Sequence, residues 1–298
     1  MFKKCGFTII YSLILISFTI YIILDTFVNT KVYSIVELSE NNISTTQNLA
    51  TGEVTSTSDL YEDDNIKIEL KEYTIQNTKA YVADVQIKNA ELLKTGFANN
   101  SYGKNITAKT STIANSFNAI LAINGDYYGV QESGYVLKNG VVYRSTSAGN
   151  KEDLVIYKDG SFEIINESEV DINTLLNNGA YNILSFGPSL VRNGTVSISE
   201  NYEVARAMTS NPRTAIGIID DLHYVFVVSD GRTTDSEGLT LYELADFMKN
   251  TLGVEIAYNL DGGGSSTMYF NGKVINNPTT NGNKISERSV SDIVYIGY

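Results

Sequence analysis

Apolar residues occur in two kinds of run along this chain. Residues 7–24 form one uncharged apolar run, which is long enough to cross the hydrocarbon core of a membrane as a helix. From about residue 65 the apolar runs are short, and in Ile66-Lys67-Ile68-Glu69-Leu70 they alternate with polar residues, as expected for a half-buried strand. The stretch between them is rich in Ser, Thr, Asn and acidic residues, with too little apolar surface to offset the entropy of ordering. The pattern predicts a cytoplasmic end and transmembrane signal-anchor in residues 1–30, a flexible stem in 31–64, and one folded domain in 65–298.

Turn signals predict that the folded domain contains several β-hairpins. Residues 80–87 form an apolar run that we expect to pair with residues 66–70. Asn-Gly and Asp-Gly pairs are the preferred centres of type I′ hairpin turns. They separate short strand-like runs at Asn139-Gly140, Asp159-Gly160, Asn193-Gly194 and Asn271-Gly272.

Helical patterns are fewer. Thr240 and Glu243 have the spacing of a capping box, and apolar residues follow at helical intervals until Gly253. Weaker helical patterns cover residues 110–117 and 172–177. The predicted fold class is α+β, a mixed and largely antiparallel sheet with a few helices, preceded by one N-terminal transmembrane helix.

The residues beside the long apolar run predict its topology. Lys3 and Lys4 precede the run, and basic residues on this side favour a cytoplasmic N-terminus. We therefore expect a single-pass protein of the cell membrane with its domain outside the cytoplasm. A cleaved signal peptide is the alternative, but such peptides end in a small-x-small site, which Asp25-Thr26-Phe27-Val28 does not provide. Cys5 is the only cysteine, so no disulfide framework is expected.

The charge balance limits the class of partner. The chain has 22 basic and 34 acidic residues and a formal net charge of −12. Such a surface repels phosphate backbones, so we expect no nucleic-acid partner. An anionic substrate would require a local cluster of arginines. His223 is the only histidine, and a histidine-rich zinc site is therefore not expected.

Residues 259–268, Asn-Leu-Asp-Gly-Gly-Gly-Ser-Ser-Thr-Met, carry the strongest chemical signal. Consecutive glycines permit positive φ angles, and their N–H groups then form a concave site suited to phosphate. A flexible hairpin turn is the alternative. The candidate site residues of this segment are the carboxylate of Asp261 and the loop Gly262, Gly263, Gly264, Ser265, Ser266 and Thr267.

Other polar clusters follow predicted strands. Asn124 and Asp126 come after the apolar run 119–123, and Asp230 and Arg232 come after the apolar run 224–228. The alternative is a hairpin turn for the first pair and an exposed turn for the second. Arg213 and Arg288 precede apolar strands, where a guanidinium group can bind phosphate through two hydrogen bonds or simply remain solvated.

Six blocks in this order resemble the phosphodiester glycosidase family. They are Ile123-Asn124-Gly125-Asp126-Tyr127-Tyr128, Phe186-Gly187-Pro188-Ser189-Leu190, Pro212-Arg213-Thr214-Ala215-Ile216-Gly217, Asp230-Gly231-Arg232, the segment 238–245, and residues 259–268. The family hydrolyses the bond between a sugar anomeric carbon and a phosphodiester oxygen, and many bacterial members are described as exopolysaccharide-related. Together with the topology predicted above, the resemblance implies an extracytoplasmic hydrolase that acts on a sugar-1-phosphodiester in an envelope or exopolysaccharide-type glycan.

The reaction assigns provisional roles to these residues. Cleavage of a glycosyl phosphate requires neutralisation of the departing phosphate and attack at the anomeric carbon. Asp126, Asp230 and Asp261 are the candidate catalytic carboxylates, without individual assignments. Their oxygen atoms are also a candidate site for a divalent cation. A polysaccharide-binding module without catalysis and a phosphodiesterase that cuts P–O bonds are the alternatives. Substrate or phosphate contacts are expected from Asn124, Arg213, Arg232, Arg288 and the 262–267 loop.

Overall fold

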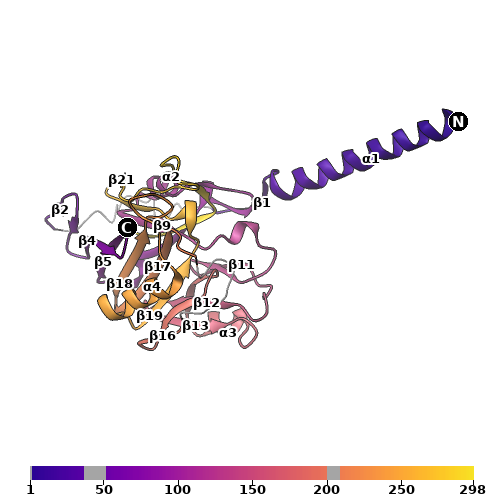
Figure 1. The fold of residues 1–298 in the computed structure, drawn as a ribbon. Helices are drawn as coiled ribbons and strands as arrows, with labels where there is room; N and C mark the ends of the chain where they lie inside the picture. The colour runs from indigo at the N-terminus through magenta and orange to yellow at the C-terminus, as the bar shows by residue number, and fades with distance from the viewer. Residues whose placement is uncertain (1, 37–51, 200–208) are drawn as a thin grey trace.

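The computed structural model describes residues 2–36, 52–199 and 209–298 and is built around one large sheet (Figure 1). All strand pairings in these ranges are antiparallel, and the α+β class is confirmed. In spatial order the nine strands are β16 (Thr195–Val196), β15 (Ser189–Arg192), β19 (Ile256–Leu260), β17 (Arg213–Asp220), β18 (His223–Ser229), β5 (Thr78–Ile87), β4 (Ile66–Ile75), β3 (Leu60–Glu62) and β2 (Thr55–Ser56).

Two smaller sheets cover one face of this central sheet. The five-stranded sheet contains β21 (Lys273–Val274), β20 (Met268–Phe270), β9 (Leu121–Asn124), β23 (Asp292–Ile296) and β6 (Leu93–Phe97). The three-stranded sheet contains β13 (Phe162–Asn166), β12 (Glu152–Tyr157) and β14 (Ala180–Leu184). Two-stranded pairs complete the fold: β1 (Lys31–Ile35) with β7 (Ser101–Lys104), β10 (Val136–Lys138) with β11 (Val141–Arg144), and β8 (Ala108–Lys109) with β22 (Ser289–Val290).

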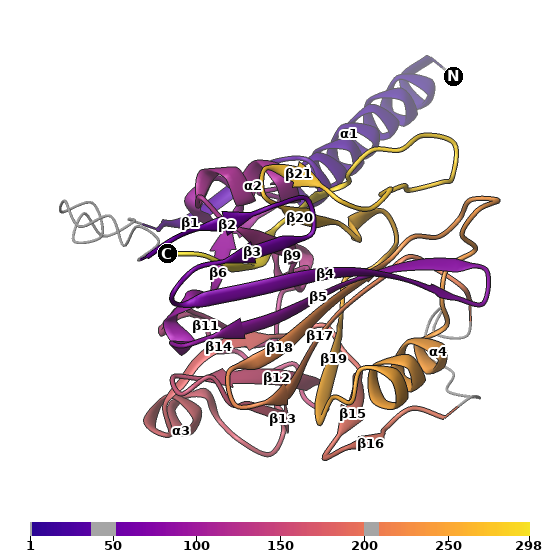
Figure 2. The ribbon, with the colours of Figure 1, turned by 90° about the vertical axis from the view of Figure 1, so that its left-hand side faces the viewer.

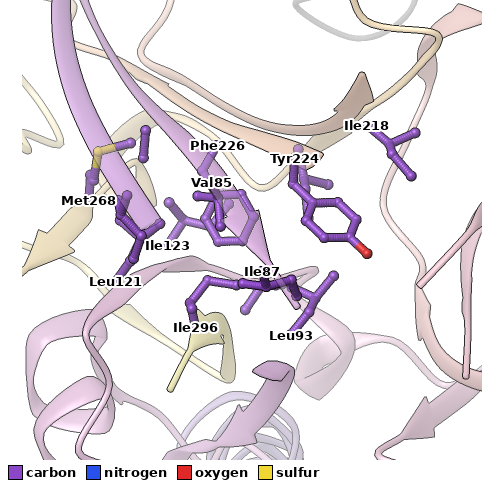
Figure 3. Packing of buried hydrophobic residues seen from close by; sticks show 14 of the residues in the cluster. Val85, Ile87, Leu93, Leu121, Ile123, Ile218, Tyr224, Phe226, Met268 and Ile296 are labelled. Carbon is purple, nitrogen blue, oxygen red and sulfur yellow. The ribbon is translucent and has the colours of Figure 1, made fainter. Parts of the chain in front are cut away.

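The main hydrophobic core lies between the central sheet and the two smaller sheets. Phe226 of β18 and Val85 of β5 face Leu121 of β9 and Ile296 of β23 across it (Figure 3). These side chains are almost completely buried. Successive side chains of a strand point to opposite faces, so β17 and β18, which are buried on both faces, place one row of side chains in this core and the other row in a second core on the opposite side of the sheet.

Helices cover the outer faces of the sheets (Figure 2). The helix α4 (Leu241–Asp246) packs Leu244 and Ala245 against the other side of the central sheet. Its predicted capping box is confirmed, since Thr240 accepts from the N–H of Glu243 and the Glu243 side chain accepts from the N–H of Thr240. The helix continues as a π-helical turn, Phe247–Thr251, which the sequence did not predict. Two shorter helices lie where they were expected, α2 (Thr110–Ser116) on the five-stranded sheet and α3 (Ile172–Asn177) on the three-stranded sheet.

Three of the four predicted type I′ turns have the required backbone. Both central residues have positive φ at Asn139-Gly140, Asn193-Gly194 and Asn271-Gly272. At the fourth turn, between β12 and β13, positive φ is found at Gly160 and not at Asp159. The Asp159 carboxylate instead accepts hydrogen bonds from the N–H and hydroxyl groups of Ser161, which holds a different turn.

The N-terminal part contains one long apolar helix, α1 (Phe2–Phe27). Its segment Gly6–Phe27 is long and apolar enough for a membrane anchor or a signal sequence, and none of it is buried in the protein. The stem prediction needs correction where the structure describes it. Strand β3 pairs with the side of β4 that β5 leaves open, β2 pairs with β3, and β1 pairs with β7. Residues 31–35, 55–56 and 60–62 of the predicted stem are therefore strands, because an open strand edge pairs readily. Residues 37–51 of the predicted stem lie outside the described residues.

Candidate active site

Three strands of the central sheet bring distant candidate residues to one edge. Arg213 at the start of β17 is paired with Ser229 at the end of β18, and Thr214 is paired with Leu260 at the end of β19. Because antiparallel neighbours run in opposite directions, the start of β17 lies beside the two ends. Asp230 and Asp261, each one residue beyond its strand, therefore lie at the same edge as Arg213.

Asn124 connects this edge to the five-stranded sheet. It is the last residue of β9 and is fully buried. Its Nδ2 donates to the backbone oxygen of Asp261 at 2.6 Å, and its Oδ1 accepts from Thr214 Oγ1 at 2.8 Å and from the N–H of Thr267 at 3.3 Å. The side chain that the sequence analysis assigned to substrate is therefore used to join the two sheets.

Asp261 forms a compact polar group with Ser265 and Arg288. The hydroxyl of Ser265 donates to Asp261 Oδ2 at 2.6 Å and accepts from Arg288 Nε at 2.9 Å. Arg288 Nη2 donates to Asp261 Oδ2 at 2.9 Å and to Oδ1 at 3.2 Å. The Arg288 side chain is 40% exposed and that of Asp261 is 12% exposed, so this ion pair lies at the surface end of the group.

The three glycines form a tight turn whose shape is required by its neighbours. Gly263 has a φ of 64°, which confirms the predicted positive φ. A Cβ atom would lie 2.9 Å from Arg232 Nη2 at Gly263, 2.8 Å from the backbone oxygen of Pro212 at Gly262, and 2.4 Å from Thr280 Oγ1 at Gly264. The glycines therefore allow three other segments to approach the turn closely.

The predicted phosphate nest needs correction at the level of hydrogen bonds. The N–H of Gly263 donates to the backbone oxygen of Pro212, and those of Ser265 and Ser266 donate to Gly262 and Gly263. The N–H of Thr267 is taken by Asn124. Ser266 and Thr267 are fully buried, and their hydroxyl groups have no hydrogen-bond partner among the described residues. Four N–H groups of the predicted nest, those of Gly263, Ser265, Ser266 and Thr267, are therefore used within the protein.

Arg232 supplies a second guanidinium group beside the glycine turn. Its Nη2 donates to Asn211 Oδ1 at 3.0 Å, and its Nη1 donates to the backbone oxygen of Thr280. Its backbone has a φ of 63°, a conformation uncommon for a residue with a long side chain. The structure thus places Arg232 and Arg288 on the same glycine turn. The two residues are separated by 55 positions in the sequence, so their proximity was not predicted.

Arg213 is more deeply placed than the other two arginines. Its Nε donates to the backbone oxygen of Leu239 at 2.8 Å, and its Nη2 donates to that of Thr209 at 2.9 Å. Burial, and after it the positive charge of Arg232, lowers the pKa of Arg213 to about 10. A bound anion would offset both causes, since it favours the charged form of Arg213.

Asp230 is held by neutral donors. Its Oδ1 accepts from the N–H of Asn277 at 2.8 Å and from Asn276 Nδ2 at 3.3 Å. Its Oδ2 accepts from Asn277 Nδ2 at 3.0 Å and from the hydroxyl of Tyr81 at 3.3 Å. Asn276 Nδ2 also donates to the backbone oxygen of Ser266, so Asp230 is connected to the glycine loop through one amide.

Asp126 lies in the interior and is part of a buried charge cluster. Lys138 Nζ lies 3.0 Å from Asp126 Oδ2 and 2.7 Å from Asp292 Oδ2, and all three side chains are buried. Asp126 Oδ1 accepts from the N–H of Tyr128, and its Oδ2 accepts from the N–H of Ser185 as well as from Lys138. Asp292 Oδ1 accepts from the N–H of Asp126. With its oxygens used in this way, Asp126 is placed to organise the protein, in contrast to the catalytic role considered from the sequence.

The two carboxyl groups of this cluster titrate differently. Burial alone would raise the pKa of Asp126, but the charge of Lys138 and the hydrogen bonds to the carboxylate keep it below its ordinary value. Burial, and then the charge of Asp126, raises the pKa of Asp292 to about 6. Burial also disfavours the Lys138 cation, but the two carboxylates hold the pKa of Lys138 above its ordinary value.

Several of these partners were missed by the sequence analysis. Asp292 opens an apolar strand and Lys138 lies at the end of one, and a charged residue in such a strand is a signal of buried pairing. Asn211, Asn276 and Asn277 carry no comparable signal in so asparagine-rich a chain. Their roles depend on contacts between segments far apart in the sequence.

Two further observations concern metal ligands and cavities. Among the described residues, no group of three or more His, Cys, Asp or Glu side chains is placed to hold a metal ion. A cavity of about 800 Å³ lies beside β1, lined by aromatic residues that include Tyr33, Phe97 and Tyr143. None of the candidate aspartates or arginines lines this cavity, so the polar group around Asp261, and not the cavity, carries the candidate chemistry.

The candidate aspartates and arginines lie within a region that matches a known protein family. Residues 117–297 match the family model described as phosphodiester glycosidase. The chain belongs to the phosphodiester glycosidase family. Membership supports hydrolysis of a sugar phosphodiester as the reaction class. Strands β4 and β5 precede the matched region, although both belong to the central sheet.

Curated relatives are longer than this chain. It is 33% identical over 178 residues to the SPbeta prophage-derived uncharacterized protein YomE of Bacillus subtilis (strain 168), covering 59% of this chain and 26% of the relative. It is 28% identical over 174 residues to N-acetylglucosamine-1-phosphodiester alpha-N-acetylglucosaminidase of Mus musculus, covering 53% of this chain and 33% of the relative. The chain thus matches about a quarter to a third of these proteins.

Solved structures show the same fold. The catalytic domain of zebrafish N-acetylglucosamine-1-phosphodiester alpha-N-acetylglucosaminidase, auto-inhibited by its pro-peptide, aligns with a TM-score of 0.63 at 21% identity, covering 83% of this chain and 88% of that domain. A hypothetical protein from Synechocystis aligns with a TM-score of 0.57 at 16% identity, covering 82% and 64%. At these identities the likeness concerns the fold.

Replacement of the buried cation tests the charge cluster. We expect Lys138→Met to lower the free energy of unfolding by about 3–5 kcal/mol at neutral pH, because two buried carboxyl groups lose their cation. Without it, both carboxyl groups have pKa values raised in the folded state. Protonation of these carboxyl groups therefore stabilises the folded variant at low pH, and this stabilisation is lost as the pH rises. The difference in the free energy of unfolding between the wild type and the variant should shrink as the pH is lowered. Denaturant unfolding at several pH values measures this, with the exposed Lys158→Met as control; a pH-independent difference would contradict the account.

Alanine substitutions at two glycines separate backbone strain from the position of Arg232. Gly263→Ala and Gly272→Ala both place a side chain at positive φ, a strain of about 1–3 kcal/mol. A Cβ atom meets Arg232 at Gly263 and has open space at Gly272. We expect similar losses of thermal stability from both variants but weaker binding of a sugar-1-phosphodiester only from Gly263→Ala, measured by calorimetry. Equal binding by the two variants would remove the glycine turn from the ligand site.

Proposed function

We propose that this chain is an extracytoplasmic hydrolase, anchored in the membrane through residues 7–24, that cleaves the glycosidic bond of a sugar-1-phosphodiester in an envelope or exopolysaccharide-type glycan. The observation that carries the proposal is the placement of Arg232 and Arg288 on one glycine turn beside Asp261. The turn provides close approach, the arginines provide positive charge, and Asp261 provides a carboxylate at the same place.

The local charge is opposite to that of the whole chain. Arg213, Arg232 and Arg288 bring three positive charges to the sheet edge where Asp230 and Asp261 bring two negative charges, while the chain carries −12. A local positive region in an acidic protein attracts an anionic group to that region specifically. Guanidinium groups suit phosphate because their planar N–H donors match two phosphate oxygens.

The proposed reaction follows from this charge arrangement. The bond between the anomeric carbon and the phosphodiester oxygen breaks, and the oxygen leaves with its electron pair on the phosphate. Arg232 and Arg288 are positioned to stabilise the negative charge of that leaving group. Asp261 is the carboxylate that either removes a proton from the attacking water or attacks the anomeric carbon itself. Ser265 and Arg288 fix its orientation through the contacts described above.

Hydrolysis in water labelled with ¹⁸O tests the bond that is cleaved. The full chain, purified in detergent, is incubated with UDP-GlcNAc and with a teichoic-type phosphodiester. We expect sugar release with unlabelled phosphate, because water attacks carbon and not phosphorus. The label is read in the phosphate product, since the anomeric oxygen of a free sugar exchanges with water. Label in the phosphate would establish P–O cleavage, and ligand binding without product would establish a binding module.

Asp261→Asn tests the carboxylate directly. The substitution preserves the size and some hydrogen bonds of the side chain but removes its charge and its capacity for proton transfer. We expect turnover to fall by at least roughly a hundredfold, the scale of general acid–base catalysis. Initial rates are compared with those of Asp159→Asn, an exposed turn residue, after both variants are shown to be folded by thermal unfolding. Near-wild-type turnover of folded Asp261→Asn would restrict Asp261 to positioning Arg288.

A further inference from the structure

The end of α1 is fixed to the folded domain by side-chain and backbone contacts. Asn105 Nδ2 donates to the backbone oxygen of Thr26 at 3.1 Å and to that of Asn29 at 3.0 Å. The last carbonyl groups of a helix have no partner within the helix, so Asn105 supplies partners from the domain. Lys31 forms an ion pair with Asp25 at 2.7 Å across the same junction. Strand β1 begins at Lys31 and pairs with β7, so the helix enters the domain directly.

The first strand carries an apolar surface that continues that of the helix. The register of β1 shifts between Val32 and Ser34, and such a bulge interrupts the alternation of side chains. Val32, Tyr33 and Ile35 are 57%, 60% and 74% exposed. Phe27 and Val28 at the end of α1 are 74% and 60% exposed. Contiguous large apolar side chains on a protein surface mark an interaction site.

We propose that β1, together with the end of α1, lies in the interfacial layer of the membrane, so that the domain is held against the lipid surface instead of on a flexible stem. This inference rests on the proposed anchoring by residues 7–24. The occupant is lipid because the exposed residues of β1 follow directly from the apolar surface of α1, which extends away from the domain with β1 at its base (Figure 1).

The chemistry of β1 suits the membrane interface. Tyrosine is enriched where its ring meets acyl chains and its hydroxyl meets water. The backbone of β1 is paired with β7, which lowers the cost of placing it near apolar surroundings. Lys31 and Lys104 are paired with each other across the two strands, and they form ion pairs with Asp25 and Glu132 respectively, so carboxylates of the protein balance both charges at this depth. A domain seated in this way reaches glycans close to the membrane surface.

Tryptophan fluorescence tests this placement, because the natural chain contains no tryptophan. Tyr33→Trp and Ile35→Trp each introduce one probe on β1, and Tyr242→Trp on α4 is the matched control away from α1 (Figures 1 and 2). The full-length variants are reconstituted at one copy per lipid nanodisc, with ordinary lipid or with lipid brominated near the headgroup. We expect quenching by the brominated lipid and a blue-shifted emission for both β1 probes. The control, whose side chain is half-buried in the protein, should not be quenched by the brominated lipid.

The outcomes separate the membrane anchor from the interfacial strand. Flotation with liposomes first establishes whether the chain is membrane-bound. A chain that does not float overturns the anchor and, with it, this inference. A chain that floats but whose two β1 probes are quenched no more than Tyr242→Trp retains the anchor and overturns the interfacial placement. A blue shift without quenching by brominated lipid indicates contact with protein, which also overturns it.

Discussion

The buried side chain of Asn124 is the interaction on which the site depends. It is the point where the central sheet and the five-stranded sheet are joined at the edge that carries Arg213 and Asp261. Its amide uses both ends, holding the backbone of Asp261 on one side and Thr214 and Thr267 on the other. An unpaired amide at this depth costs about 1–3 kcal/mol, so the three segments stay together because each satisfies part of one buried polar group.

Packing then decides where positive charge lies. The glycine turn has no side chains of its own between Asp261 and Ser265, and Arg232 occupies the space that a Cβ at Gly263 would need. Arg288 contacts the same turn by donating hydrogen bonds to Asp261 and to the backbone oxygen of Gly262. Both guanidinium groups lie at one turn, so an anion bound between or beside them would interact with both.

Sequence reasoning succeeded where the determining interactions are local. The capping box at Thr240 and three Asn-Gly turns depend on residues that are neighbours in the chain, and the structure has them as expected. The positive φ of Gly263 was also expected, because glycine permits it, but residue type did not distinguish it from Gly262, which has a φ of −115°. Long-range pairing was not predictable: Lys138 approaches Asp126 and Asp292 only after three separate strands have assembled. The edge pairing of β3 with β4 likewise turned part of a polar segment, expected to be a flexible stem, into sheet.

The environments of the three aspartates separate roles that the sequence left equivalent. Asp126 has a buried ammonium partner and further N–H donors, so its charge is balanced by groups inside the protein. Asp230 is surrounded by amide and hydroxyl donors that fix both oxygens. Asp261 instead faces a partly exposed arginine at the glycine turn. A phosphate that draws Arg288 toward itself would loosen the hold on Asp261, so ligand binding and release of the carboxylate are coupled through one guanidinium group.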